Sequence, residues 1–125
     1  MPGPDAMPPA RLRIRVVFGD AAMIGPGKAD LLDHIAATGS IAAAGRAMGM
    51  SYKRAWMLVE TLNAMFRAPL VDRLRGGPTR GGAVLTPTGR AVLDAYRLLE
   101  ASAGAAAAAP LAAMTDLLCD MPGRK

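Results

Sequence analysis

Residues 40–56 read SIAAAGRAMGMSYKRAW, and this stretch decides the expected fold. Ser40 is a favoured N-cap residue, because its hydroxyl can accept a hydrogen bond from an amide in the first turn of a helix. Gly49 follows a run of small and apolar residues, and glycine readily adopts the left-handed conformation that ends helices. Ser51 is a second N-cap candidate two positions later. The stretch therefore predicts a helix over 41–48, a very short turn and a second helix.

The second helix is expected to extend to about Phe66 and to be amphipathic. Its apolar residues fall on one stripe that must face a core: Ala55, Leu58, Val59, Leu62, Met65 and Phe66. At about 100° per residue, the opposite side carries Lys53, Met57 and Glu60, with Arg54, Thr61 and Trp56 at its edges. A helix with such a basic outer face is suited to the major groove of DNA. The residues expected to read the duplex are Ser51, Tyr52, Lys53, Arg54, Trp56 and Met57.

Trp56 lies between the core stripe and the outer face, so two roles stay open for it. An aromatic side chain at this angle either packs against a neighbouring element or contacts DNA. Tyr52 leaves the same choice, and both roles are kept as hypotheses.

The formal net charge of +5 is concentrated in one part of the chain. From Arg46 to Arg80 there are seven basic and two acidic residues, whereas the rest of the chain holds eight of each. Arginine also solvates protein surfaces, and a pI near 10.1 alone would leave that interpretation open. The local excess is what a phosphate-facing surface needs, and it favours double-stranded DNA as the partner.

The segment after Pro69 is typical of a β-hairpin. Two short apolar stretches, at residues 70–74 and 83–85, flank a basic loop that reads RGGPTRGG. A hairpin placed directly after a DNA-reading helix would form a wing. Gly-rich loops also cradle nucleotide phosphates, but the Walker pattern requires Gly-Lys-Ser/Thr at the start of a helix, and that pattern is missing.

Several polar side chains around the helix pair and the wing are expected to hold DNA phosphates. A helix N-terminus attracts anions through its free backbone amides, and arginine pairs with phosphate. The candidates are Ser40, Arg73, Arg75, Thr79 and Arg80. The wing arginines could instead enter the minor groove, and both interpretations stay open.

The N-terminal part combines a leader with a predicted β-hairpin. Residues 1–10 hold four prolines and a glycine, which favours a disordered leader. From Arg11 onward the residues alternate as a half-buried strand does, with Leu12, Ile14, Val16 and Phe18 on one face. Gly19-Asp20 is a turn candidate, and residues 21–24 can pair back as a second strand. The apolar spacing then predicts a helix over 28–38 that ends at Gly39.

A long helix is predicted in the C-terminal part. Thr86 can cap it, with Pro87 at its first position, and it is expected to reach Ala109 and to stop at Pro110. Its apolar residues form a narrow stripe of the kind that joins two helices: Val92, Ala95, Tyr96, Leu99, Ala103 and Ala106. The alternative is that this helix packs wholly on its own domain. Residues 111–121 predict a last short amphipathic helix.

Together these elements predict one mainly α (α+β) domain at residues 11–100. Its expected fold is a winged helix-turn-helix with an N-terminal β-hairpin and a long C-terminal dimerisation helix. Residues 101–125 are expected to form an Ala-rich helical extension and a loose tail. The stripe on the long helix makes a homodimer the expected assembly.

Few residues suit catalysis or cofactor binding. His34 and Cys119 are each alone, which excludes an intrachain disulfide and leaves no ligand set for zinc. Without paired carboxylates or an activated nucleophile, we expect no enzyme, no cofactor and no metal. No apolar run approaches the roughly 20 residues of a membrane span, and the start is unlike a signal peptide. We therefore expect a soluble cytoplasmic protein.

From about Leu12 to Leu99 the chain resembles the N-terminal DNA-binding domain of ModE-type molybdate-responsive transcriptional regulators, relatives of the LysR winged-helix group. The resemblance lies in GKADLLDHIAATGSI, GMSYKRAWMLVETLN, PLVDRLRGGPTRGGAVLTPTG and AYRLLE, in the expected order. Gly49 matches the glycine of the helix-turn-helix turn. The resemblance implies a winged helix-turn-helix homodimer that binds a palindromic promoter element.

The chain departs from that family after residue 100. Full-length members continue with small β-barrel modules that bind oxyanions, whereas residues 102–110 here are nearly all alanine. Molybdate sensing is therefore not carried over to any residue. The chain could bind DNA constitutively, answer another signal or work beside a separate sensor protein. The alternative class of function is a protein-interaction or architectural module whose winged helix docks a partner.

Overall fold

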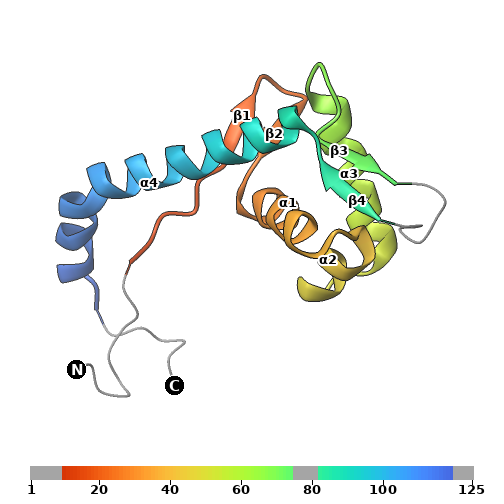
Figure 1. The fold of residues 1–125 in the computed structure, drawn as a ribbon. Helices are drawn as coiled ribbons and strands as arrows, with labels where there is room; N and C mark the ends of the chain where they lie inside the picture. Colours follow the sequence, from red (N-terminus) through yellow and green to blue (C-terminus); the bar gives the residue numbers. More distant parts are fainter. Residues whose placement is uncertain (1–9, 75–81, 120–125) are drawn as a thin grey trace.

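The computed structural model describes residues 10–74 and 82–119. Their elements follow one another as β1 (Val16–Phe18), β2 (Ala22–Ile24), α1 (Pro26–Thr38), α2 (Ile41–Ala47), α3 (Tyr52–Met65), β3 (Val71–Arg73), β4 (Ala83–Leu85) and α4 (Pro87–Asp116). Helices α1 to α3 and the two small hairpins form one body, from which α4 projects far to one side (Figure 1). This arrangement confirms the predicted winged helix-turn-helix with an N-terminal hairpin and a long C-terminal helix.

The helix pair α2 and α3 begins and ends where the local signals predicted. The Ser40 hydroxyl accepts a hydrogen bond from the Ala43 amide at 3.1 Å, and α2 starts there. The Ser51 hydroxyl accepts one from the Arg54 amide at 3.1 Å, and α3 starts there. Gly49 lies between them at a φ of 71°, a conformation that costs a glycine little.

Small residues bring α2 and α3 into close contact. Gly45 is buried in α2, and a Cβ there would lie 3.0 Å from the Ala55 Cβ of α3. The expected core stripe of α3 faces inward: Ala55, Val59 and Leu62 are buried, and the other three residues of the stripe pack against the core. The largest fully buried side chains come from four parts of the fold: Leu31, Leu32, Ile35, Val59, Leu62, Leu70 and Leu93.

The N-terminal hairpin is shorter than the alternation predicted. Strands β1 and β2 pair antiparallel with Val16 opposite Ile24, and the strand predicted from Arg11 begins only at Val16. β2 is three residues long, so the residues before Val16 have no strand to pair with. Leu12 is exposed, against expectation, because no sheet covers it. The carbonyl of Ile14 instead accepts a hydrogen bond from the Tyr96 hydroxyl of α4, at 2.6 Å.

The wing strands form as predicted and are tied to the turn between α1 and α2. β3 and β4 pair antiparallel with Val71 opposite Leu85. The Ala83 amide donates to the Gly39 carbonyl at 2.8 Å, and Ser40 forms an isolated bridge with Gly82. The wing is therefore held against the start of α2.

Asn63 joins the recognition helix to the wing, and its role was not predicted. Its side-chain oxygen accepts hydrogen bonds from the Leu70 and Val71 amides at 2.8 and 3.0 Å. Its side-chain nitrogen donates to the Val71 carbonyl at 3.1 Å. One half-buried amide thus fixes the turn between α3 and β3.

We expect Asn63→Ala to destabilise the domain by about 2–3 kcal/mol, because two part-buried backbone amides lose their acceptor. Urea unfolding followed by circular dichroism measures this loss. Asn63→Asp is the matched control, since it keeps the acceptor and loses only the donor, and it should cost less. Equal stability of Asn63→Ala and the parent chain would contradict this role.

The predicted end of the long helix at Pro110 is wrong. α4 runs from Pro87 to Asp116 with Pro110 inside it, so the separate helix expected after this residue is the last part of α4. A proline within a helix removes one backbone hydrogen bond and bends the axis, but it does not have to end the helix. The C-terminal part of α4 turns away from the rest, as the blue end of the ribbon in Figure 1 shows.

α4 also corrects the expectation about membrane spans. Its most apolar 18-residue window has a mean hydropathy of 1.2, so this helix is long and apolar enough to cross a membrane by length and composition alone. Near-continuous alanine raises the hydropathy without adding large apolar side chains. Core helices of water-soluble proteins pass the same test, so the observation is weak support for a membrane location.

Candidate nucleic-acid interface

The outer face of α3 is open to solvent at its N-terminal end. Ser51, Lys53 and Arg54 are exposed, and the side chains of Tyr52 and Met57 are more than half exposed, at 54% and 53%. These five residues therefore lie on the free surface where a duplex could reach them. The buried stripe of the same helix anchors them, because it packs α3 onto the core.

Trp56, the sixth residue predicted to read DNA, packs against the wing. The guanidinium of Arg73 in β3 lies over its indole ring, 5.2 Å from the ring centre. The same guanidinium forms an ion pair with Glu60 of α3 at 3.1 Å. A cation over an indole is attracted by the negative face of the ring. The structure thus favours the packing role for Trp56 in the free chain, and it leaves Tyr52 free.

Arg73 was predicted to contact phosphate, and its surroundings explain how it would be oriented. The ion pair with Glu60 is about 40% exposed on both sides, so the attraction is screened and weak. A phosphate could replace the Glu60 carboxylate without the loss of a buried pair. Trp56 would keep the guanidinium on the same side of β3 during that exchange.

The remaining predicted phosphate contacts divide into two groups. Ser40 is half-buried, and its hydroxyl oxygen accepts the capping hydrogen bond from the Ala43 amide, which leaves the O–H group to donate to a phosphate. Arg75, Thr79 and Arg80 lie outside the residues that the structure describes.

The residues of the predicted dimer stripe of α4 are only partly available for a dimer contact. Tyr96 is buried in its own domain, together with Gly89 and Leu93, which the stripe did not include. Ala95, Leu99 and Ala106 are exposed, and Val92 and Ala103 are half-buried. One side of the first turns of α4 therefore packs against the core, and the other side is exposed to solvent.

Four of the six stripe residues line one apolar groove of about 250 Å³. Val92, Ala95, Tyr96 and Leu99 form its α4 side, and the N-terminal hairpin and Phe66 form the other. Phe18 of the hairpin meets Phe66 edge-on, with ring centres 6.0 Å apart, and remains 46% exposed. This groove is an apolar surface next to the free edge of α4.

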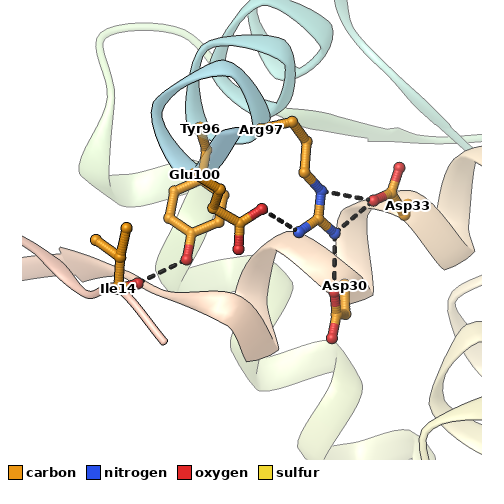
Figure 2. Close-up of polar contacts among 6 residues, drawn as sticks. All are labelled: Ile14, Asp30, Asp33, Tyr96, Arg97 and Glu100. Atoms are coloured by element: carbon orange, nitrogen blue, oxygen red, sulfur yellow. Dashed lines mark hydrogen bonds and ion pairs between the residues drawn. The ribbon is translucent and has the colours of Figure 1, made fainter. Parts of the chain in front are cut away.

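A charged cluster between α1 and α4 was missed by the sequence reasoning (Figure 2). The Arg97 guanidinium donates to Asp30 at 2.8 Å, to Asp33 at 3.0 Å through Nε, and to Glu100 at 2.9 Å. Burial opposes the charge on Arg97, yet the hydrogen bonds to Asp30, Glu100 and Asp33 outweigh it and raise its pKa. Burial and the nearby Glu100 raise the pKa of Tyr96. The cluster keeps a permanent cation between three carboxylates.

These features define a winged helix-turn-helix protein: a helix pair joined by a tight glycine turn, an exposed and basic second helix, and a wing that follows it. The sequence profile of the bacterial regulatory helix-turn-helix proteins of the lysR family matches residues 28–90. The chain belongs to this family of bacterial regulatory helix-turn-helix proteins.

The relatives support the resemblance to ModE-type regulators. The chain is 46% identical over 80 residues to the molybdenum-pterin-binding protein MopB of Rhodobacter capsulatus, which covers 64% of this chain and 30% of MopB. It is 42% identical over 74 residues to the DNA-binding transcriptional dual regulator ModE of Escherichia coli K12, covering 59% of this chain and 28% of ModE. The chain thus matches less than a third of the length of these relatives.

A solved structure has the same fold. The DNA-binding domain of CbnR, determined in a complex with DNA, matches 70% of this chain and 95% of its own length. The sequence identity is 26% and the TM-score is 0.54.

Proposed function

We propose that the chain binds a specific operator sequence through α3, as a homodimer on an inverted repeat. The observation that carries this proposal is the exposed, basic N-terminal end of α3, where Tyr52, Lys53, Arg54 and Met57 stand free on a helix anchored to the core. The related CbnR domain was solved with DNA, which supports the same use of the fold here.

The proposed reading mechanism places the first turns of α3 in the major groove. Recognition helices contact base edges mainly with their N-terminal residues. Arg54 or Lys53 would pair with O6 and N7 of a guanine, and each good contact is worth about 1–3 kcal/mol of discrimination. Met57 would contribute an apolar contact to a thymine methyl group.

The wing would hold the phosphate backbone beside this groove. The contacts of Arg73 with Trp56 and Glu60, which hold its guanidinium beside α3, support this role. Arg75, Thr79 and Arg80 belong to the same proposal on sequence grounds. These contacts would fix the register of the domain on the duplex and add no direct base recognition.

We expect the wing arginines to determine how steeply binding weakens with salt. Replacing Arg75 and Arg80 together by alanine should lower the slope of log affinity against log salt by roughly 0.9 for each phosphate that is no longer neutralised. Titrations of a labelled duplex at four salt concentrations measure this slope. An unchanged slope would show that the loop stays off the DNA.

The homodimer would form through the free edge of α4 and the apolar groove beside it. Phe18 and Leu99 are partly exposed at this groove, and a second copy would cover them. Two recognition helices related by a two-fold axis would lie roughly 34 Å apart, so the operator should be an inverted repeat. Sedimentation equilibrium tests the assembly: a monomer at micromolar concentration would contradict it.

The names of the relatives support a link to molybdenum or oxyanion metabolism. They include the molybdenum transport protein ModE of Azotobacter vinelandii, which is 43% identical over 70 residues. We propose that the chain regulates genes of this metabolism in the bacterial cytoplasm. Specific binding to promoters of molybdate-uptake genes would support this link, and no preference for them over unrelated promoters would contradict it.

A further inference from the structure

We propose that Arg97, held by Asp30, Asp33 and Glu100, sets the direction in which α4 leaves the domain and thereby the half-site spacing of the operator. This inference rests on the proposed homodimer. It assigns Arg97 a positioning role in DNA recognition, although the side chain lies on α4 and not on the DNA-reading face.

The first observation is the position of the cluster along α4. The buried residues of this helix are Gly89, Leu93 and Tyr96, and from Arg97 onward the described residues are half-buried or exposed. Arg97 is thus at the point where the helix leaves its own core. Figure 1 shows that α4 projects beyond the body.

The second observation is the connectivity of the guanidinium. It donates hydrogen bonds to Asp30 and Asp33 of α1, and to Glu100 one turn further along α4 (Figure 2). A planar guanidinium presents its donors in a rigid fork, so contacts in several directions restrain orientation as well as distance. The Tyr96 hydroxyl also donates a hydrogen bond to the carbonyl of Ile14, which lies just before the N-terminal hairpin. The exit of α4 is therefore restrained from two sides.

The third observation is the charge balance. Three carboxylates surround one cation, so Asp30 and Asp33 would repel Glu100 if Arg97 were removed. The Arg97 side chain is 34% exposed, and partly exposed ion pairs add little to the stability of a fold. The role proposed for the cluster is therefore to restrain the angle between α1 and α4 and not to stabilise the fold.

A small change in the angle between α1 and α4 matters because the proposed dimer interface lies on α4. The 14-residue helix α3 is about 20 Å long, and this length is used as the approximate width of the DNA-binding body attached to α4. Tilting a body of this size by about 10° moves its far side by roughly 3.5 Å, about the rise of one base pair. With the same tilt in both subunits, the recognition helices would shift by roughly two base pairs.

The test is selection of operators from a duplex pool with randomised sequence, performed with the parent chain and with Arg97→Ala. We expect both to enrich the same half-site, the parent with one spacing and Arg97→Ala with spacings spread over about two or more base pairs. Arg97→Ala should also bind the parent's duplex about tenfold more weakly, while its affinity for a single half-site changes less than twofold. A purely structural defect would weaken half-site binding as well.

Arg90→Ala is the matched control. It removes an arginine from the same helix, but the partner of Arg90 is Asp94 on α4 itself, so the bonds between α4 and α1 stay in place. This control should keep the parent's spacing. Arg97→Lys is the replacement variant if Arg97→Ala does not fold. Lysine keeps the positive charge but lacks the planar set of guanidinium donors, so it should also broaden the range of half-site spacings.

The outcomes separate this inference from the proposed function. If the parent chain enriches an inverted repeat and the Arg97 variants keep its spacing and affinity, only the positioning role is overturned. If the parent chain enriches no sequence, the proposed function fails and the inference fails with it.

Discussion

Arg54→Ala and Lys53→Ala are each expected to reduce affinity for the selected operator by about five- to 150-fold, which is the equivalent of the roughly 1–3 kcal/mol that one base contact contributes. Both side chains are exposed at the start of α3. Their removal should leave the unfolding free energy within about 0.5 kcal/mol of the parent. Fluorescence anisotropy on the operator and on a scrambled duplex measures the effect, and the loss should be larger on the operator.

Arg67→Ala is the control for the loss of charge alone. Arg67 is also exposed, but it lies beyond the C-terminal end of α3. Its removal should weaken binding to both duplexes by a similar, smaller factor. If the operator affinity of both α3 variants stays at the parent's level, the assignment of α3 as the reading helix is wrong.

Gly89→Ala is expected to destabilise the fold by about 3 kcal/mol or more. A Cβ at this position would lie 2.0 Å from the Leu70 carbonyl oxygen, so α4 would have to move away from the start of the wing. The same region holds the Thr86 amide, which donates to the Leu70 carbonyl at 2.9 Å. Overpacking of a tight contact costs about 1–3 kcal/mol and occasionally more, and here the obstructing atom is backbone.

Gly104→Ala separates this steric effect from helix propensity. Apart from the adjacent backbone of α4 itself, no atom of the described residues lies within 4 Å of a Cβ built at Gly104, so alanine should stabilise α4 by up to about 1 kcal/mol. Urea unfolding of the two variants should therefore change in opposite directions. If Gly89→Ala is as stable as the parent, the close approach of α4 to Leu70 does not exist in solution.

The local signals in the sequence were sufficient for the main elements. Ser40, Gly49 and Ser51 act through their own backbone and the next few residues, so the helix-turn-helix could be predicted without tertiary information. The wing followed from two apolar stretches around a Gly-rich loop. The error at Pro110 came from treating proline as an absolute stop, although a helix can continue past it with a bend.

The contacts between distant segments could not be predicted in this way. Asp30 and Arg97 are 67 residues apart in the sequence, where each has the pattern of an ordinary solvated charge. Their contact exists only because α1 and α4 pack together. Asn63 showed no signal on α3, because its partners lie on a turn whose path depends on the wing. The role of Trp56 stayed open for the same reason: helical angles place it at an edge, and only the position of Arg73 shows what lies there.

The most direct test of the central claim is a titration of the parent chain onto two labelled duplexes, its selected inverted repeat and a scrambled sequence of equal composition. At physiological salt we predict that the inverted repeat binds at least about a thousandfold more tightly, as specific regulators do. Equal, weak affinity for both duplexes would contradict operator recognition and would favour an architectural or partner-docking module instead.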